Sequence, residues 1–122
     1  MASQFRNVDA WQTSVALAVE IYRVCSTFPR HERFGLVDQM QRAAVSVPSN
    51  IAEGRGRATV RDYRNYVFHA PGSSYELETQ IEIAKLLGYI GEEKAISLTE
   101  ATNAVQRLIN GLIRSLDAKL SP

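Results

Sequence analysis

Apolar residues recur along this chain at gaps of three and four positions, and this spacing restricts its fold more than any other feature. The first segment that shows it carries Trp11, Val15, Ala18, Tyr22 and Cys25. Two later segments, which begin at residues 63 and 95, repeat the same pattern. Such gaps align side chains on one face of an α-helix, whereas the two-residue alternation of a β-strand is absent. The sequence therefore predicts an all-α protein.

Proline and glycine residues divide the chain into four helical segments. The breaks fall at residues 28–31, 54–57 and 88–91. Four helices joined by short loops favour an antiparallel up-and-down four-helix bundle. Pro48 and Pro71 lie inside the second and third segments, where a proline removes a backbone donor and clashes with the preceding turn. We expect both helices to kink there, with a complete interruption at Pro71 as the alternative.

Length and composition predict a single domain over residues 1–122, with frayed ends at 1–8 and 119–122. The lone cysteine, Cys25, cannot form an internal disulfide, which favours a reducing compartment. No stretch reaches the roughly 18 apolar residues of a membrane span, and no signal-peptide pattern opens the chain. We therefore expect a cytoplasmic protein without a membrane partner.

The first helical segment carries a second apolar seam beside the first one. Its candidate contact residues are Leu17, Ile21, Val24 and Phe28. Together the two seams cover about half the helix circumference, whereas one core-facing stripe needs roughly 100°. We expect the second seam to pack against another subunit of a homo-oligomer. The alternative is a broad core stripe with scattered exposed aliphatic residues.

Polar residues form one line on the second helix and another on the third. A network that joins the two lines would contain Gln39, Arg42, Ser46, Asn50, Glu53, His69, Ser73 and Glu76. Because consecutive helices pack together, these side chains are expected to hydrogen bond across the interface and fix its register. The alternative is a pair of solvated faces. Both interpretations give these residues a structural role.

Charge nearly cancels over the chain, with 14 Lys and Arg against 13 Asp and Glu, but it is unevenly distributed. Residues 54–64 hold four arginines and one aspartate, a local +3, while residues 76–100 hold six carboxylates and two lysines, a local −4. Arginine suits bidentate phosphate contacts, and Tyr63 and Tyr66 lie near enough to stack on a base. The candidate RNA contacts are Arg55, Arg57, Arg61 and Arg64. Alternatively, these arginines pair with acidic residues of the same chain or of a neighbour.

No catalytic pattern stands out. Dimetal helical bundles use Glu-x-x-His pairs, and neither His31 nor His69 has a glutamate three positions before it. A site formed by His69 with Glu53 and Glu76 is the least supported alternative. Cys25 lies on an apolar seam, where a thiol is usually inert. We therefore expect no enzyme activity, no metal, no cofactor and no small-molecule substrate.

Several motifs resemble the 23S rRNA-intervening sequence protein family in order and spacing, over about residues 8–115. The most specific is Ser-Val-Pro-Ser-Asn-Ile-Ala-Glu-Gly at 46–54, which is accompanied by Gly-Ser at 72–73 and Leu-Gly-Tyr at 87–89. The resemblance implies a small cytosolic bacterial four-helix bundle that assembles as a ring, with a homopentamer expected. A related branch comprises the basic, nucleic-acid-binding accessory proteins of diversity-generating retroelements. Here the near-neutral charge departs from that branch, and Pro71 departs from the family pattern.

These observations predict a non-enzymatic, ring-forming helical bundle. Two roles remain open for it: contact with RNA through the four arginines, or a protein–protein scaffold in which those arginines hold subunits together.

Overall fold

The computed structural model describes residues 4–121, and every regular element in that range is a helix. The elements are η1 (Gln4–Asn7), α1 (Asp9–Cys25), η2 (Arg30–Glu32), α2 (Leu36–Arg55), α3 (Val60–Val67), α4 (Ala70–Leu86) and α5 (Glu92–Leu120). The predicted all-α class is therefore confirmed over the described residues. No helix in this range is long and apolar enough to cross a bilayer.

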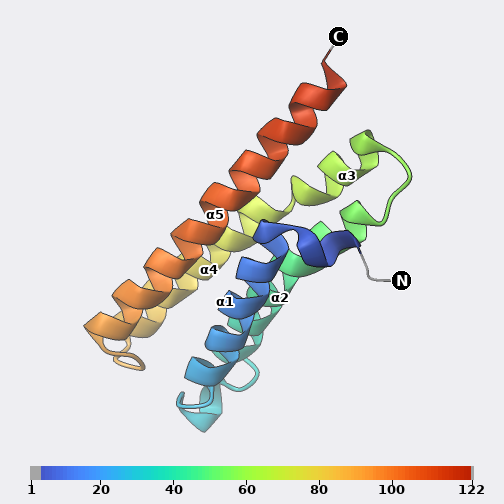
Figure 1. The fold of residues 1–122 in the computed structure, drawn as a ribbon. Helices are drawn as coiled ribbons and strands as arrows, with labels where there is room; N and C mark the ends of the chain where they lie inside the picture. The colour runs from blue at the N-terminus through green and yellow to red at the C-terminus, as the bar shows by residue number, and fades with distance from the viewer. Residues whose placement is uncertain (1–3, 122) are drawn as a thin grey trace.

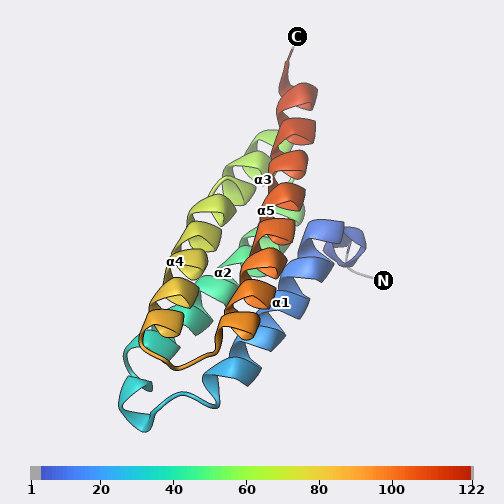
Figure 2. The ribbon, with the colours of Figure 1, turned by 90° about the vertical axis from the view of Figure 1, so that its left-hand side faces the viewer.

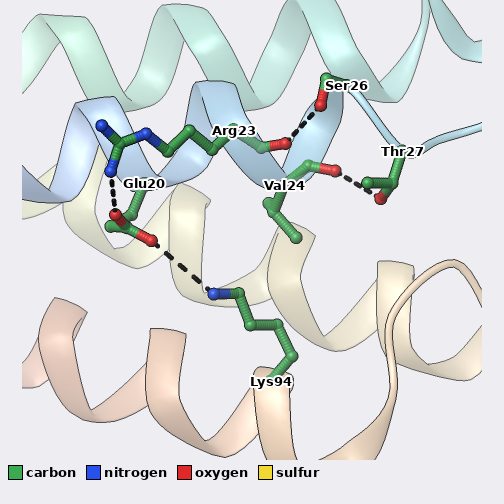
Figure 3. A network of polar contacts seen from close by, with 6 residues as sticks. All are labelled: Glu20, Arg23, Val24, Ser26, Thr27 and Lys94. Carbon is green, nitrogen blue, oxygen red and sulfur yellow. Dashed lines mark hydrogen bonds and ion pairs between the residues drawn. The ribbon is translucent and has the colours of Figure 1, made fainter.

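The long helices lie side by side as a bundle (Figure 1). The loops at 26–35 and 87–91 lie at one end, and the turn at 56–59 and the last turn of α5 lie toward the other (Figures 1 and 2). Helix α2 packs against α1 and α4, and α5 packs against α1, α3 and α4. Glu20 of α1 pairs with Arg23 at 2.9 Å and with Lys94 of α5 at 3.6 Å, which joins α1 to α5 (Figure 3).

The third predicted helix is divided in two. Helix α3 ends at Val67 and α4 begins at Ala70, so the interruption near Pro71 is present rather than a kink within one helix. Pro71 lies in the first turn of α4, where its missing N–H has no intrahelical acceptor to lose. Pro48, in contrast, lies inside the continuous helix α2 and is buried.

The second seam of α1 belongs to the core of the chain itself. Ile21 is 0% exposed, and Leu17, Val24 and Phe28 are also buried. Helix α1 lies between α2 and α5, so both neighbours cover part of a wide apolar stripe. This corrects the expectation that the seam is spare surface for another subunit. The exposed large apolar residues of α1 are instead Val19 and Tyr22.

Parts of both ends where the sequence predicts fraying are helical in the structure. The Phe5 ring meets the Trp11 ring edge-on at 5.1 Å, which packs η1 onto α1. Helix α5 continues to Leu120. The rest of the predicted fraying falls on residues 1–3 and 122, which lie outside the described residues.

Candidate functional site

The arginine-rich region is a tight turn between α2 and α3. Thr59 caps α3, because its hydroxyl accepts a hydrogen bond from the Asp62 N–H at 3.1 Å. Gly54 is buried where the two helices approach each other. A Cβ at this position would lie 2.8 Å from the Tyr66 Cβ and 2.9 Å from the Tyr63 carbonyl oxygen. Glycine at 54 therefore permits the close contact that brings the arginines together.

Three of the four predicted arginines contact aromatic rings of their own chain. The guanidinium carbons lie 5.8 Å from the Tyr63 ring for Arg55 and 4.7 Å from the Tyr66 ring for Arg57. The third, that of Arg64, lies 4.5 Å from the ring of Phe68. Tyr63 and Tyr66, which the sequence suggests could stack on bases, thus pack against arginines of their own chain instead.

Two of these arginines also reach a carboxylate. Arg57 pairs with Glu53 at 2.6 Å and donates to the Tyr66 hydroxyl. Arg64 pairs with Asp117 of α5 at 2.8 Å, which ties α3 to the last turns of the bundle. Arg61 is exposed, and among residues 4–121 it forms no ion pair, hydrogen bond or ring contact. It is the arginine of the turn that is most available to an external anion.

The Tyr63 ring is a structural support rather than an exposed platform. It is 9% exposed, and burial raises the pKa of its hydroxyl while the Arg55 charge opposes that rise. Phe68, in contrast, is 55% exposed beside Arg64. At this turn, Arg61 is therefore exposed without a partner among residues 4–121, and the Phe68 ring is exposed beside Arg64.

The predicted polar network forms at its centre. Ser73 of α4 donates to the Ser46 Oγ of α2 at 2.9 Å. Asn50 donates to the Ser46 carbonyl oxygen at 2.8 Å and to its Oγ at 3.1 Å. These three residues are partly buried, so the bonds cross the α2–α4 interface away from bulk water.

The other five members do not join that network. Arg42 pairs with Asp38 one turn away at 2.9 Å, and Glu53 pairs with Arg57. The remaining three, Gln39, His69 and Glu76, are exposed. The alternative of solvated faces therefore holds for the outer part of both lines.

An open groove of about 400 Å³ runs along the same interface. It is lined by Gln39, Arg42, Ala43, Ser46, Ser73, Glu76 and Gln80. Gln80 is 7% exposed, and within residues 4–121 its Oε1 has no hydrogen-bond partner. The pattern of apolar positions in the sequence does not reveal this residue. The signal that could have found it is its spacing, three residues after Leu77 and four before Ala84, which puts a glutamine in the buried stripe of α4.

The groups that suggested metal or thiol chemistry lie apart from one another. Among residues 4–121, no three His, Cys, Asp or Glu side chains gather closely enough to bind a metal ion. His69 is exposed while Glu53 is held by Arg57. Cys25 is buried, and burial raises the pKa of its thiol to about 11, which keeps it protonated and unreactive.

Comparison with known proteins gives one family. Residues 6–111 match the family model described as 23S rRNA-intervening sequence protein. The chain belongs to this family. A solved structure from Bacteroides thetaiotaomicron VPI-5482, described as a protein of unknown function from the S23 ribosomal protein family, superposes with a TM-score of 0.76 at 22% identity. The match covers 85% of this chain and 97% of that one, and it shows the common fold. No curated protein matches the sequence.

The string at 46–54, by which the chain resembles the 23S rRNA-intervening sequence proteins, has a clear structural basis. Ser46 and Asn50 form the network, Val47 and Ile51 fill the core, and Gly54 allows the close approach of α3. Residues 46–54 of α2 therefore supply the hydrogen-bond network, the core contacts and the close approach of α3.

A second feature that the sequence did not reveal joins the two loops at the opposite end of this 23S rRNA-intervening sequence protein. The Tyr89 hydroxyl donates to Glu32 at 2.7 Å, and the Tyr89 ring lies 5.2 Å from the Phe28 ring. The hydrogen bond from Tyr89 and a second one from the Leu36 N–H lower the pKa of Glu32. Residues 57 positions apart in sequence form this contact, so no local pattern could indicate it.

Proposed function

We propose that this chain is a non-enzymatic cytosolic helical bundle that self-associates into a ring, with a pentamer expected, and contacts RNA through its arginine-rich end. The observation that carries the RNA contact is the arrangement of Arg57, Arg61 and Arg64 at one end of the bundle. Two of them are held on aromatic rings, and Arg61 faces solvent without a partner in the described chain. Pre-ordered guanidinium groups lose less entropy when they bind phosphate.

Exposed apolar side chains on α4 and its following loop support self-association. Tyr75 is 57% exposed, Ile83 42%, Leu86 74% and Leu87 55%. Single exposed aliphatic residues are ordinary, but here four large ones fall within 13 positions on one helix and its end. A contact with another copy would cover them.

Self-association is tested by sedimentation equilibrium of the wild-type chain. One chain has a mass of 13.6 kDa, so a pentamer sediments as a species of about five times that mass. A mass that stays at that of one chain up to high concentration would contradict the proposal.

The RNA contact is tested by the salt dependence of binding to a structured RNA. Replacing Arg57 and Arg61 with glutamine removes two charges from the turn. The matched control replaces Arg30 and Arg33, which lie in the loops at the other end of the bundle. We expect the turn variant to weaken binding and to reduce the slope of log K against log salt by about 0.7 to 0.9 for each phosphate that it no longer neutralises. Equal effects of both variants would indicate nonspecific attraction only.

The intrachain pairs favour a second candidate, a protein–protein scaffold without RNA. Arg57 and Arg64 already have carboxylate partners in the chain. If wild-type protein self-associates but binds no RNA at low salt, the scaffold is the better description.

The architecture proposed for the chain in solution is an antiparallel up-and-down four-helix bundle with a bend in α2 at Pro48. It is supported by the placement of successive loops at opposite ends (Figure 2) and by the lost backbone donor at Pro48. Residual dipolar couplings measured along α2 test the bend, because a straight helix fits one axis throughout.

A further inference from the structure

Phe68 directly follows the last residue of α3, and its aromatic ring is open to solvent. The residue is 55% exposed, and the Arg64 guanidinium carbon lies 4.5 Å from the ring centroid. A planar ring has two faces, and the guanidinium group covers only one of them. Among residues 4–121, no second aromatic ring packs on Phe68. The chain therefore leaves one stacking surface of this ring unused.

Two hydrogen bonds show what lies beside Phe68 on α5. Arg64 donates to Asp117, and Ser74 donates to Gln106, so residue numbers fall along α5 as they rise along α3 and α4. Phe68 lies four residues after Arg64 and six before Ser74. Counting along α5 from either bond places it level with residues 112–113.

Arg114 brings a second guanidinium group to this level. It precedes Asp117 by three residues, so the two are neighbours on the surface of α5. Its Nη2 lies 3.8 Å from the position that a Cβ would take at Gly111, which directs the guanidinium group back toward the level of Phe68. Arg114 is exposed, and among residues 4–121 it forms no ion pair.

Positive charge is in excess over the whole of this end. Arg61 precedes Arg64 by one helical turn and is exposed without a partner among the described residues. Residues 54–67 and 110–121 together hold six Arg and Lys against two Asp. One of these two, Asp117, already pairs with Arg64. Phosphate groups are therefore attracted to the surface around Phe68.

Phe34, at the opposite end of the bundle, shows that an arginine on an exposed ring does not by itself specify a ligand. It is 86% exposed, and the Arg33 guanidinium carbon lies 5.3 Å from its ring centroid. The residues at that end, 26–38 and 87–94, hold three Arg and Lys against four Asp and Glu. This balance gives phosphates no net attraction, so the two rings differ in their electrostatic surroundings.

We propose that Phe68 stacks on an unpaired base of RNA while Arg61 of α3 and Arg114 of α5 neutralise phosphates of the same strand. This inference rests on the proposed RNA contact and narrows it to single-stranded RNA. A base inside a duplex is stacked between its neighbours and has no free face for the ring, whereas an unpaired base has one. Arg64 holds the opposite face of the ring and is itself held by Asp117, so the stacking surface is ordered before RNA binds.

Fluorescence anisotropy tests the stacking, with one labelled unstructured RNA strand measured alone and paired with its complement. We expect Phe68→Ala to weaken binding of the single strand about tenfold and binding of the duplex by less than about twofold. The slope of log K against log salt should stay unchanged, because a ring neutralises no phosphate, whereas Arg114→Gln should reduce it by about 0.7. Phe68→Trp should bind the single strand as tightly as the wild type. The matched control, Phe34→Ala, should leave both affinities unchanged.

The outcomes separate this inference from the proposed function. If the wild-type chain binds neither form of RNA, the proposed function fails and the inference fails with it. If it binds both forms equally, or if the control variant weakens binding as much as Phe68→Ala, the inference is overturned while the RNA contact stands. If Phe68→Trp loses binding together with Phe68→Ala, the residue supports the fold and does not stack on a base, which also overturns it. A change in the mass of Phe68→Ala in sedimentation equilibrium would place the ring between copies of the chain and overturn it as well.

Discussion

At the arginine-rich end, Arg57 and Arg64 each reach a carboxylate and an aromatic ring of their own chain. In the α2–α4 groove, in contrast, the buried Oε1 of Gln80 has no hydrogen-bond partner among residues 4–121. Both regions adjoin α2, and both are rich in polar side chains. They differ in whether the fold satisfies those side chains.

This difference separates two uses of a polar residue. A satisfied ion pair or hydrogen bond holds helices in register and costs stability when it is removed. An unsatisfied buried group costs stability while it is present and regains that cost only when something binds. The same kind of substitution should therefore have opposite signs in the two regions.

The largest effect is expected from alanine at Gly54, compared with alanine at Gly72 in the first turn of α4. The new Cβ at 54 would clash with the Tyr63 carbonyl oxygen at 2.9 Å, whereas at 72 it would meet nothing within 4 Å. We expect Gly54→Ala to lower the free energy of unfolding by about 2 kcal/mol through overpacking. Gly72→Ala should raise it by about 0.5 kcal/mol through helix propensity. Urea denaturation measures both, and equal shifts would contradict the close packing at 54.

The next effect concerns buried polar groups of α4. Gln80→Met removes the unpartnered amide at nearly constant volume, so we expect the free energy of unfolding of the single chain to rise by about 1 kcal/mol. The matched variant is Ser74→Ala, which removes a buried hydroxyl that donates to Gln106. It should cost about 1 kcal/mol. Thermal denaturation at a concentration where the chain is dissociated compares them, and a loss for Gln80→Met would show that its amide is satisfied.

How much of this the sequence predicts depends on the range of each signal. Helical spacing predicts the all-α class, and adjacent polar faces predict the Ser46–Ser73 bond, because both follow from the period of one helix. The sequence leaves the break before Pro71 open, since proline suits either a kink or a new first turn. The prediction that another subunit covers the seam containing Ile21 is wrong, because the chain itself buries this residue. Periodicity gives the width of an apolar stripe but does not indicate which element covers it.

The candidate site divides in the same way. The cluster of arginines is visible in the sequence, but their rings and carboxylates come from the meeting of α2, α3 and α5. Gln80 differs from its buried neighbours only by being polar. Whether such a residue has a partner is a property of the packed interface, and spacing alone does not decide it.

A smaller effect is expected at the end of the bundle formed by the loops at 26–35 and 87–91. There Glu32 accepts a hydrogen bond from Tyr89, just as Arg57 and Arg64 have partners at the other end. The pKa of Glu32 lies below its usual 4.5, first because Tyr89 donates to it and then because the Leu36 N–H does. Its contribution to stability is therefore present above pH 4.5 and is lost as pH falls through the lowered pKa. Tyr89→Phe should flatten this acid dependence in urea denaturation between about pH 6 and pH 3. Parallel curves for variant and wild type would show that the bond does not hold in solution.

The smallest effect is expected for Arg57→Gln. The pair of Arg57 with Glu53 is solvent-exposed, with side chains 41% and 57% exposed, so its removal should cost less than about 0.5 kcal/mol and the cost should shrink in high salt. Arg57 could therefore leave Glu53 and bind a phosphate at little cost in the free energy of folding. If this variant instead costs as much as Ser74→Ala, the arginine belongs to the structural framework of the turn, and among the arginines of the turn Arg61 alone is left to contact RNA.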